Sequence, residues 1–338
     1  MSRASRARRI AVAAAYGGGG VGLLTAGALG LFRAEVALAR RAIGEPDSQA
    51  PRADGIHGRH HGGDPIRFAM LGDSSAVGFG VQQAHQTPGV MLAAGVAECA
   101  DRPVDLTCVG AVGARSCDLD TQIDLLPDGP FDVAVIMIGA NDVTHRVRPA
   151  NAVRQLDQAV RRLRETGAQV VVGTCPDLGT VEPVPQPLRY LARRWSRQMA
   201  AAQTMVVVEA GGRTVSLGDI LGPEFAASPS EMFGPDRFHP SAAGYASAAA
   251  ALLPSVCAAL DVWFETDVEE PDLGRGDAIQ PIAEAAAEAA EQPGTEVAAT
   301  QVAGKERGPR GRWALLRHRR KRSALDVQAA AAEEAAQD

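Results

Sequence analysis

Aromatic residues and paired cysteines are both scarce in this chain of 338 residues. Only 4% of the residues are aromatic, which argues against long stacking platforms for sugars or bases. The five cysteines include no C-x-x-C pair, which argues against a zinc site, and any disulfide pairing among them stays open. The formal net charge of -6 shows no excess of positive charge, so nucleic acid is not expected as a partner.

Charged residues are absent between positions 10 and 32, directly after the arginine-rich residues 1–9. An apolar run of this length can cross a bilayer as a helix, and its basic flank would stay in the cytoplasm. The sequence therefore predicts a membrane anchor that places the rest of the chain on the outer side of the cell membrane. A signal peptide cleaved near "AGA" at 26–28 is the alternative, and the product would then be secreted.

Residues 33–64 are interpreted as a linker, because from position 44 onward they are rich in glycine, proline, aspartate and histidine. His57, His60 and His61 in this segment raise the question of a metal site. A flexible run of histidines without a cysteine or carboxylate partner is usually solvated. No metal site is therefore predicted at these histidines.

A regular alternation of apolar runs and helical patterns begins at Ile66 and indicates one folded domain over residues 65–262. Helical patterns cover 87–100 and 151–167. This order predicts a three-layer α/β/α domain around a parallel sheet. The five runs with the length and β-branched content of buried strands are 66–71, 104–109, 132–138, 169–174 and 204–209.

Four short motifs lie where the predicted strands end or where the domain closes. Because the carboxyl ends of parallel strands meet at one edge of a sheet, the motifs are expected to meet there. Together they supply a hydroxyl, a flexible backbone donor, a side-chain amide and an imidazole three residues after a carboxylate. These are the components of acyl transfer by a serine. The motifs are "GDSS" at 72–75, "GAVG" at 110–113, "GAND" at 139–142 and "DRFH" at 236–239.

Each motif also has a purely structural interpretation. A turn after a strand explains Ser74 or Gly113 taken alone, and a helix cap explains Asn141 or His239 taken alone. Asp142 is expected to brace a loop. The coincidence of all four motifs at the predicted strand ends favours a site over four unrelated turns.

The ordered set of motifs resembles the SGNH (GDSL-type) hydrolases, and most of all the exported or membrane-tethered esterases of actinobacteria. The resemblance covers about residues 66–260 and implies the SGNH hydrolase fold, with a flavodoxin-like five-stranded sheet. It also implies a serine esterase of the cell envelope that acts on acyl or acetyl esters of lipids, glycans or small molecules. Two alternatives stay open, an acyltransferase that uses the same residues and a non-catalytic binding module.

Carried over residue by residue, the resemblance implies that Ser74 is the nucleophile and His239 its general base. Asp236 would orient the imidazole. The oxyanion hole would consist of the N–H groups of Ser74 and Gly113 and the side-chain amide of Asn141. This chemistry requires no metal and no organic cofactor.

Segregated blocks of charge and low-complexity sequence over residues 263–338 predict a disordered tail. The basic run at 305–322 contains a tryptophan and two leucines and is a candidate for contact with an anionic membrane or envelope surface. A solvated tail without a partner is the alternative.

Overall fold

The computed structural model describes residues 49–262 and three two-residue strands at 296–297, 301–302 and 305–306. The predicted anchor at 10–32 and the basic run at 305–322, apart from its first two residues, lie outside the described residues.

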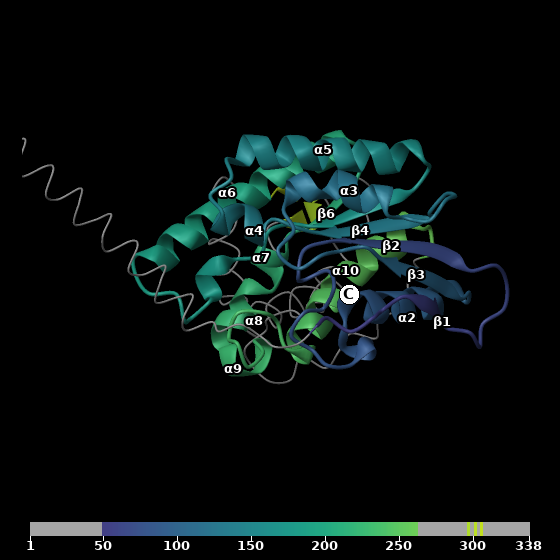
Figure 1. The fold of residues 1–338 in the computed structure, drawn as a ribbon, viewed down its shortest axis with the longest axis horizontal. Coiled ribbons are helices and arrows are strands. Elements are labelled where there is room, and N and C mark those ends of the chain that lie inside the picture. The colour runs from purple at the N-terminus through teal and green to yellow at the C-terminus, as the bar shows by residue number, and fades with distance from the viewer. Residues whose placement is uncertain (1–48, 263–295, 298–300, 303–304, 307–338) are drawn as a thin grey trace, which may run out of the picture.

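Strands β1 to β6 form one mixed sheet, and the two-residue β7 extends it to seven strands (Figure 1). The strand order is β1-β3-β2-β4-β5-β6-β7. Strands β2 to β6 are parallel to their neighbours, and β1 is antiparallel to β3. The bounds are β1 Gly55–His57, β2 Ile66–Gly72, β3 Val104–Cys108, β4 Val133–Met137, β5 Gln169–Gly173, β6 Arg213–Val215 and β7 Glu296–Val297, with β8 Gln301–Val302 and β9 Lys305–Glu306 pairing separately.

The predicted parallel strands are confirmed for β2 to β5, and β6 adds a fifth parallel strand at another position than predicted. The prediction is wrong at the edge, where β1 makes the sheet mixed. In β1, Gly55 lies opposite Leu106 and His57 opposite Val104. Ala53, just before the strand, is buried in the same core. The stretch interpreted as a linker at 33–64 therefore contains an edge strand.

The predicted strand at 204–209 is wrong, because this run forms the end of helix α6 (Leu188–Glu209). Within the run Val207 is fully buried, whereas Met205 is 61% exposed, as expected for one helical turn with a single apolar side. The sheet position is taken instead by β6, whose three residues are too few to show a periodic pattern.

Helices cover both faces of the sheet, so the three predicted layers are present (Figure 1). Successive residues of β2 point to opposite faces. Phe68 and Met70 pack with α2 and α10, and Ala69 and Leu71 pack on the face covered by α3, α5 and α6. The helices are α2 Pro88–Ala100, α3 Leu119–Asp124, α4 Ala140–Thr144, α5 Pro149–Glu165, α6, α7 Leu217–Ile220, α8 Gly222–Ala227, α9 Pro229–Met232 and α10 Ala242–Ala259, with 3-10 turns at Ala84–Gln86, Ser116–Asp118 and Leu178–Thr180.

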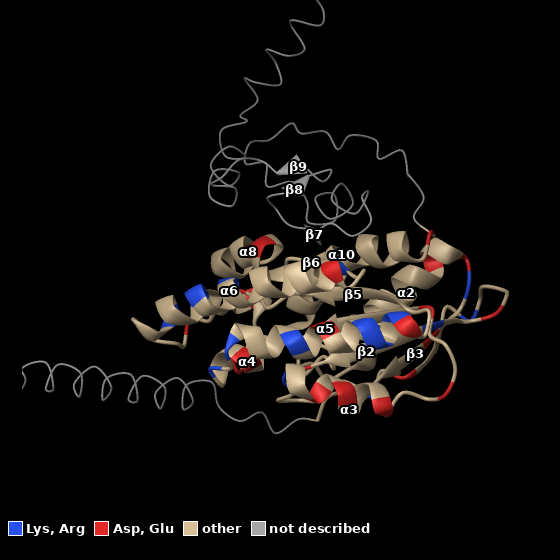
Figure 2. Ribbon diagram, turned by 90° about the horizontal axis from the view of Figure 1, so that it is seen from above, with Lys and Arg blue, Asp and Glu red and all other residues tan. Residues whose placement is uncertain are grey.

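Both helices that the sequence predicted by their patterns are confirmed. Helix α2 begins after Thr87, whose hydroxyl accepts a hydrogen bond from the N–H of Val90. Helix α5 buries Leu156 and Leu163 against the sheet, and Figure 2 marks the charged residues along its ribbon. One of these, Arg162, forms ion pairs with acidic residues of α3.

Helix α10 is the one helix in the described part of the chain that is long and apolar enough to cross a membrane. It packs against α2 and the sheet, and 61% of it is buried inside the domain. Its apolar composition is therefore that of a core helix.

Candidate active site

The carboxyl ends of the parallel strands bring most of the predicted site residues to one edge of the sheet. Ser74 follows β2, Asn141 is the second residue of α4 after β4, and His239 precedes α10; all three line the same pocket. The carboxylate of Asp236 contacts the ring of His239. Gly113 lies in the loop after β3 and is not among the residues that line the pocket.

Asp236 and His239 form a close pair. The Nδ1 atom of His239 lies 2.6 Å from Oδ2 of Asp236, and both side chains are nearly buried. With Nδ1–H donating to the carboxylate, the neutral imidazole carries its lone pair on Nε2. The pair therefore supplies an imidazole with a fixed tautomer at the pocket.

The loop around Asp236 holds this carboxylate in its ionised form. Its Oδ1 atom accepts hydrogen bonds from the N–H groups of Phe238 and His239, both at 3.0 Å. Burial alone would raise the pKa of Asp236, but the bonds from the His239 side chain and the two N–H groups outweigh it and lower the pKa. A permanently charged partner stabilises a protonated imidazole.

The turn that carries Ser74 depends on the glycine before it. Gly72 has a φ of +131°, and a Cβ at this position would overlap the carbonyl oxygen of Met137 on the neighbouring strand. The N–H of Asp73 donates to the same carbonyl at 2.9 Å. Ser74 is thus delivered to the pocket by a turn packed directly on β4.

Asp73 is buried beside the candidate nucleophile. Its Oδ1 atom accepts a hydrogen bond from the N–H of Ser75 at 2.9 Å. Burial raises the pKa of Asp73 to about 6, against the smaller lowering effects of that bond and of His239. Asp73 therefore braces the turn at a cost in stability when it is ionised.

Asp142 has the bracing role that the sequence predicted for it. Its carboxylate accepts a hydrogen bond from the hydroxyl of Ser116 at 2.9 Å and another from the Ser116 N–H at 3.1 Å. These bonds join the loop after β3 to helix α4, which contains Asn141. The loop that contains Gly113 is thereby bonded to the helix that contains Asn141.

Three predicted hydrogen-bond donors lie at or beside the pocket. Within the residues that the structure describes, the N–H groups of Ser74 and Gly113 donate to no protein acceptor. Gly113 has a φ of +83° with open space where a Cβ would lie. Asn141 uses Nδ2 to donate to the carbonyl of Ala114 at 3.0 Å, which leaves its second N–H for another acceptor.

Two buried glutamines that the sequence did not single out hold the strand ends in place. Gln122 on α3 accepts from the N–H of Gly72 at 2.8 Å and donates to its carbonyl at 2.9 Å. Gln203 on α6 accepts from Cys175 N–H at 2.8 Å and donates to Ile138 at 3.0 Å. Both lie on helices remote in sequence from the turns they bind, so no local pattern identifies them.

Tyr245 is a further supporting residue, and the sequence assigned it no role. It is fully buried at the start of α10, and its hydroxyl donates to the carbonyl of Phe79 at 2.7 Å. The same hydroxyl lies 3.5 Å from the carbonyl of Ser74. The Tyr245 hydroxyl therefore contacts the backbone of the segment that contains Ser74.

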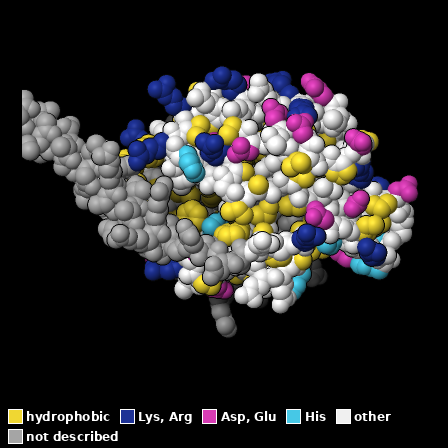
Figure 3. Space-filling view, in the orientation of Figure 1, with side chains coloured by type: hydrophobic (Ala, Val, Ile, Leu, Met, Phe, Trp, Pro, Cys, Tyr) yellow, Lys and Arg dark blue, Asp and Glu magenta, His cyan; other side chains and the backbone are white. Residues whose placement is uncertain are grey.

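The pocket behind the candidate site is lined mainly by hydrophobic side chains. Among these are residues from the segment after β5, from α7 and α8 with the turn between them, and from directly after α9. They include Leu178, Val181, Leu221, Phe225 and Phe233. Figure 3 shows hydrophobic side chains gathered near the middle of the face that is turned toward the viewer. The cavity measures about 90 Å³. A pocket that combines a few polar residues with a mainly apolar lining is suited to a small molecule with one reactive polar group and one apolar group.

The fold and the motifs at the carboxyl edge of the sheet define a hydrolase domain of the α/β class. Comparison with known proteins identifies its family. Residues 70–247 match the model of the GDSL-like Lipase/Acylhydrolase family. The chain belongs to this family, as its motifs predicted, and it is an esterase.

A curated relative and two solved structures give the comparison in detail. The chain is similar to "GDSL-like esterase Rv1075c" of Mycobacterium tuberculosis, with 40% identity over 278 residues that cover 78% of this chain and 88% of the relative. It also aligns with the crystal structure of TesA at 19% identity and a TM-score of 0.44, covering 58% of this chain and 99% of TesA. The alignment with AlinE4, an SGNH-hydrolase family esterase, has 18% identity and a TM-score of 0.42, and covers 54% of this chain and 89% of AlinE4.

Proposed function

We propose that this esterase hydrolyses short acyl esters at the cell envelope through a Ser74–His239–Asp236 triad. The observation that carries the proposal is the 2.6 Å contact between Asp236 Oδ2 and His239 Nδ1, beside a pocket that Ser74 also lines. A free serine hydroxyl is a weak nucleophile and needs such an oriented base.

In the proposed mechanism, Nε2 of His239 takes the hydroxyl proton as Ser74 Oγ attacks the ester carbonyl carbon. The imidazolium that forms is stabilised by the ionised Asp236, and it then gives the proton to the leaving alkoxide. Water attacks the acyl-serine in the second half of the cycle, with His239 again as the base. The products are an alcohol and a carboxylic acid, and Ser74 is regenerated.

The negative oxygen of the tetrahedral intermediate needs donors that are already in place. The N–H of Ser74 and the second N–H of Asn141 meet this need at the pocket, and Gly113 contributes its N–H from the adjoining loop. One such donor is worth about 3–4 kcal/mol in the transition state of comparable enzymes. The bond from Asn141 to Ala114 supports the proposal, because it fixes the amide in one orientation.

The size of the pocket supports short acyl groups as substrates. A cavity of roughly 150 Å³ holds a benzene molecule, and the cavity here measures about 90 Å³. Acetyl to butyryl groups would fit against Leu221 and Phe225, whereas a long acyl chain would have to displace them.

The envelope location rests on the sequence of residues 1–32, with a basic flank before an uncharged run. An anchor of this kind would leave the esterase domain on the outer side of the membrane. Protease treatment of intact cells tests this: the domain should be digested while cytoplasmic proteins survive. A domain that resists digestion until the cells are lysed would contradict the location.

The chemistry is tested with a fluorophosphonate probe and p-nitrophenyl esters of two to twelve carbons. The probe should label the wild-type chain and fail to label Ser74→Ala, while the matched variant Ser75→Ala should still be labelled. Turnover should be highest for the two- to four-carbon esters. Equal labelling of Ser74→Ala would refute the nucleophile, and a preference for twelve carbons would refute the acyl class alone.

A further inference from the structure

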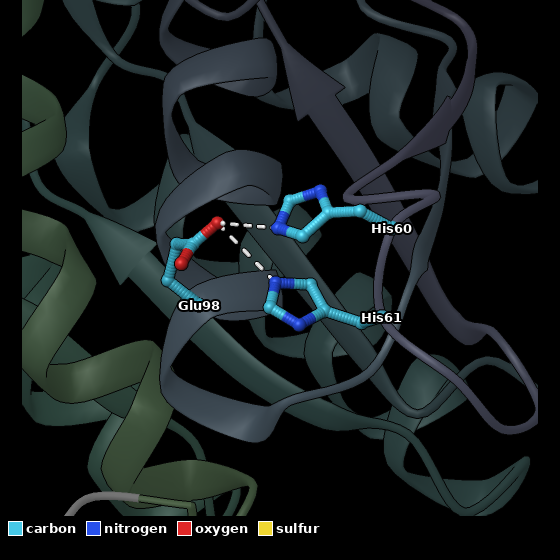
Figure 4. Close-up of side chains that lie close together, drawn as sticks. All are labelled: His60, His61 and Glu98. Atoms are coloured by element: carbon cyan, nitrogen blue, oxygen red, sulfur yellow. Dashed lines mark hydrogen bonds and ion pairs between the residues drawn. The ribbon is translucent and has the colours of Figure 1, made fainter.

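Three ligand-type side chains converge on the surface beside α2. His60 and His61 belong to the connection between β1 and β2, and Glu98 lies in the last turns of α2, as Figure 4 shows. The Nε2 atom of His60 lies 3.3 Å from Glu98 Oε1, and that of His61 lies 3.2 Å from the same oxygen. His57, the third histidine of the segment, instead contacts the carbonyl of Ala53.

We propose that His60, His61 and Glu98 form a binding site for a divalent late transition-metal ion, with Zn²⁺ as the best match. Two imidazole nitrogens and one carboxylate oxygen form a ligand set that suits zinc, whereas Mg²⁺ and Ca²⁺ prefer oxygen ligands alone. None of these three residues belongs to the esterase pocket.

The spacing of the ligand atoms fits tetrahedral coordination. Metal–ligand bonds of about 2.0–2.1 Å at tetrahedral angles place neighbouring ligand atoms about 3.3 Å apart. The two measured nitrogen–oxygen distances of 3.3 and 3.2 Å match this edge. All three ligand atoms lie within 4.8 Å of one another, so only a small rotation of one side chain is needed.

Asp101 prepares His61 as a ligand. Its Oδ1 atom lies 2.7 Å from Nδ1 of His61, and with the ring proton on Nδ1 the neutral imidazole directs its Nε2 lone pair at Glu98. A neutral imidazole nitrogen and a carboxylate oxygen repel each other at this distance unless a proton or a cation lies between them. The arrangement therefore favours a positive species at this point.

Within the described residues, the ion pairs of Glu98 and Asp101 are with histidines and not with arginine. Glu98 and Asp101 both face His61, and the nearby arginines are engaged elsewhere. Arg59 donates to the carbonyl of Ile56, and Arg102 donates to that of Asp64. The attraction for a cation is thus not cancelled by a fixed positive side chain bonded to the cluster.

The three ligand side chains differ in their exposure to solvent, so that one is fixed by its surroundings and two are free to change rotamer. The His61 side chain is 10% exposed, whereas those of His60 and Glu98 are 69% and 66% exposed. The two exposed side chains can rotate to close on an ion, and the open side admits water as the fourth ligand. Bound metal would connect the β1–β2 segment to α2 and so stabilise the edge of the sheet.

The test uses the full chain without a histidine tag, stripped of metal by a chelator and titrated with ZnCl₂ at neutral pH. Calorimetry should show one site, and the melting temperature should rise with Zn²⁺ concentration as mass action requires. The double variant His60→Ala/His61→Ala should lose at least tenfold in affinity together with the thermal shift. Absence of zinc binding by the wild-type chain, or equal binding by the double variant, would overturn the proposal.

Two control variants locate the ion. His85→Ala removes an exposed histidine elsewhere and should bind Zn²⁺ as the wild type does. His239→Ala should also keep zinc affinity, because the proposed site is separate from the esterase pocket. Loss of binding in His239→Ala, with binding retained in the double variant, would place the ion at the pocket and refute the site at Glu98.

Discussion

The side-chain amide of Gln122 forms both of its hydrogen bonds to the backbone of one residue, Gly72. The N–H of Gly72 donates to Oε1 at 2.8 Å, and its carbonyl accepts from Nε2 at 2.9 Å. Gly72 ends strand β2, and Ser74 follows two residues later. A residue 50 positions away in the chain therefore fixes the backbone from which Ser74 projects.

Replacing Gln122 with leucine should weaken both the fold and the turnover. The change leaves two buried backbone groups without partners, and we expect a loss of about 2–4 kcal/mol in the free energy of unfolding. Urea denaturation and ester hydrolysis measure the two effects. The control Gln158→Leu, at an exposed position of α5, should change neither quantity appreciably; an equal loss in both variants would show that the bonds to Gly72 are unimportant.

Ser74→Ala and His239→Ala should each lower kcat by several orders of magnitude, and the double variant should be hardly worse. Residues that act as one unit are strongly non-additive. Asn141→Ala should cost about 10²–10³ in kcat with little change in KM, because it removes one donor to the oxyanion. Steady-state kinetics on a short-chain ester test this, and additive losses in the double variant would contradict a shared mechanism.

Tyr245→Phe removes only the hydroxyl that donates to Phe79 and lies close to the carbonyl of Ser74. We expect a loss of about 1–2 kcal/mol in the free energy of unfolding and a lower kcat with nearly unchanged KM. Tyr190→Phe is the matched control, because that ring is 61% exposed. A decrease confined to KM would argue against a role in positioning Ser74.

Asp73→Asn should stabilise the domain at high pH. The folded pKa of about 6 lies above the ordinary value of 3.8, so the folded chain holds more protons between these values and loses stability as pH rises through them. Asparagine avoids this loss, which amounts to at most about 3 kcal/mol. Unfolding at pH 8 should show the gain, and it should vanish near pH 4; the exposed Asp128→Asn should show no such pH dependence.

Leu221→Ala should enlarge the pocket and move the preferred acyl chain toward greater length. The removed atoms also cost about 2–4 kcal/mol of stability, since Leu221 is buried. Hydrolysis of an ester series measures the preference, and Leu125→Ala, at a 66% exposed side chain, is the control. An unchanged chain-length profile would show that Leu221 does not limit the acyl group.

The sequence predicted the parts of the fold whose signals are local. The runs at β4 and β5 are apolar on both faces because helices cover both, whereas β3 buries only Val104 and Leu106. The D-x-x-H spacing places Asp236 within hydrogen-bond distance of His239. The same reasoning failed at 204–209, where a β-branched run belongs to a helix of 22 residues. Tertiary packing of α6 overrides the preference of valine for strands.

The supporting residues of the site were beyond such reasoning for a physical reason. Gln122, Gln203 and Tyr245 act on backbone groups that are distant in sequence, and their residue types carry no signal of their own. The cluster at His60 and His61 is similar. The carboxylates that face it lie on α2 and at the residue directly after it, so a search for partners beside the histidines could not find them.

The bond from Tyr245 to the turn of Ser74 has a consequence for the order in which the enzyme becomes active. Ser74 lies early in the domain, but Asp236, His239 and Tyr245 all arrive with its last part. Ser74 and Tyr245 are separated by 171 positions. A chain that emerges from its amino end therefore contains Ser74 long before the residues that contact its turn have been made. We expect truncated or unfinished chains not to hydrolyse esters, so that activity begins only once the last part of the domain is present and folded.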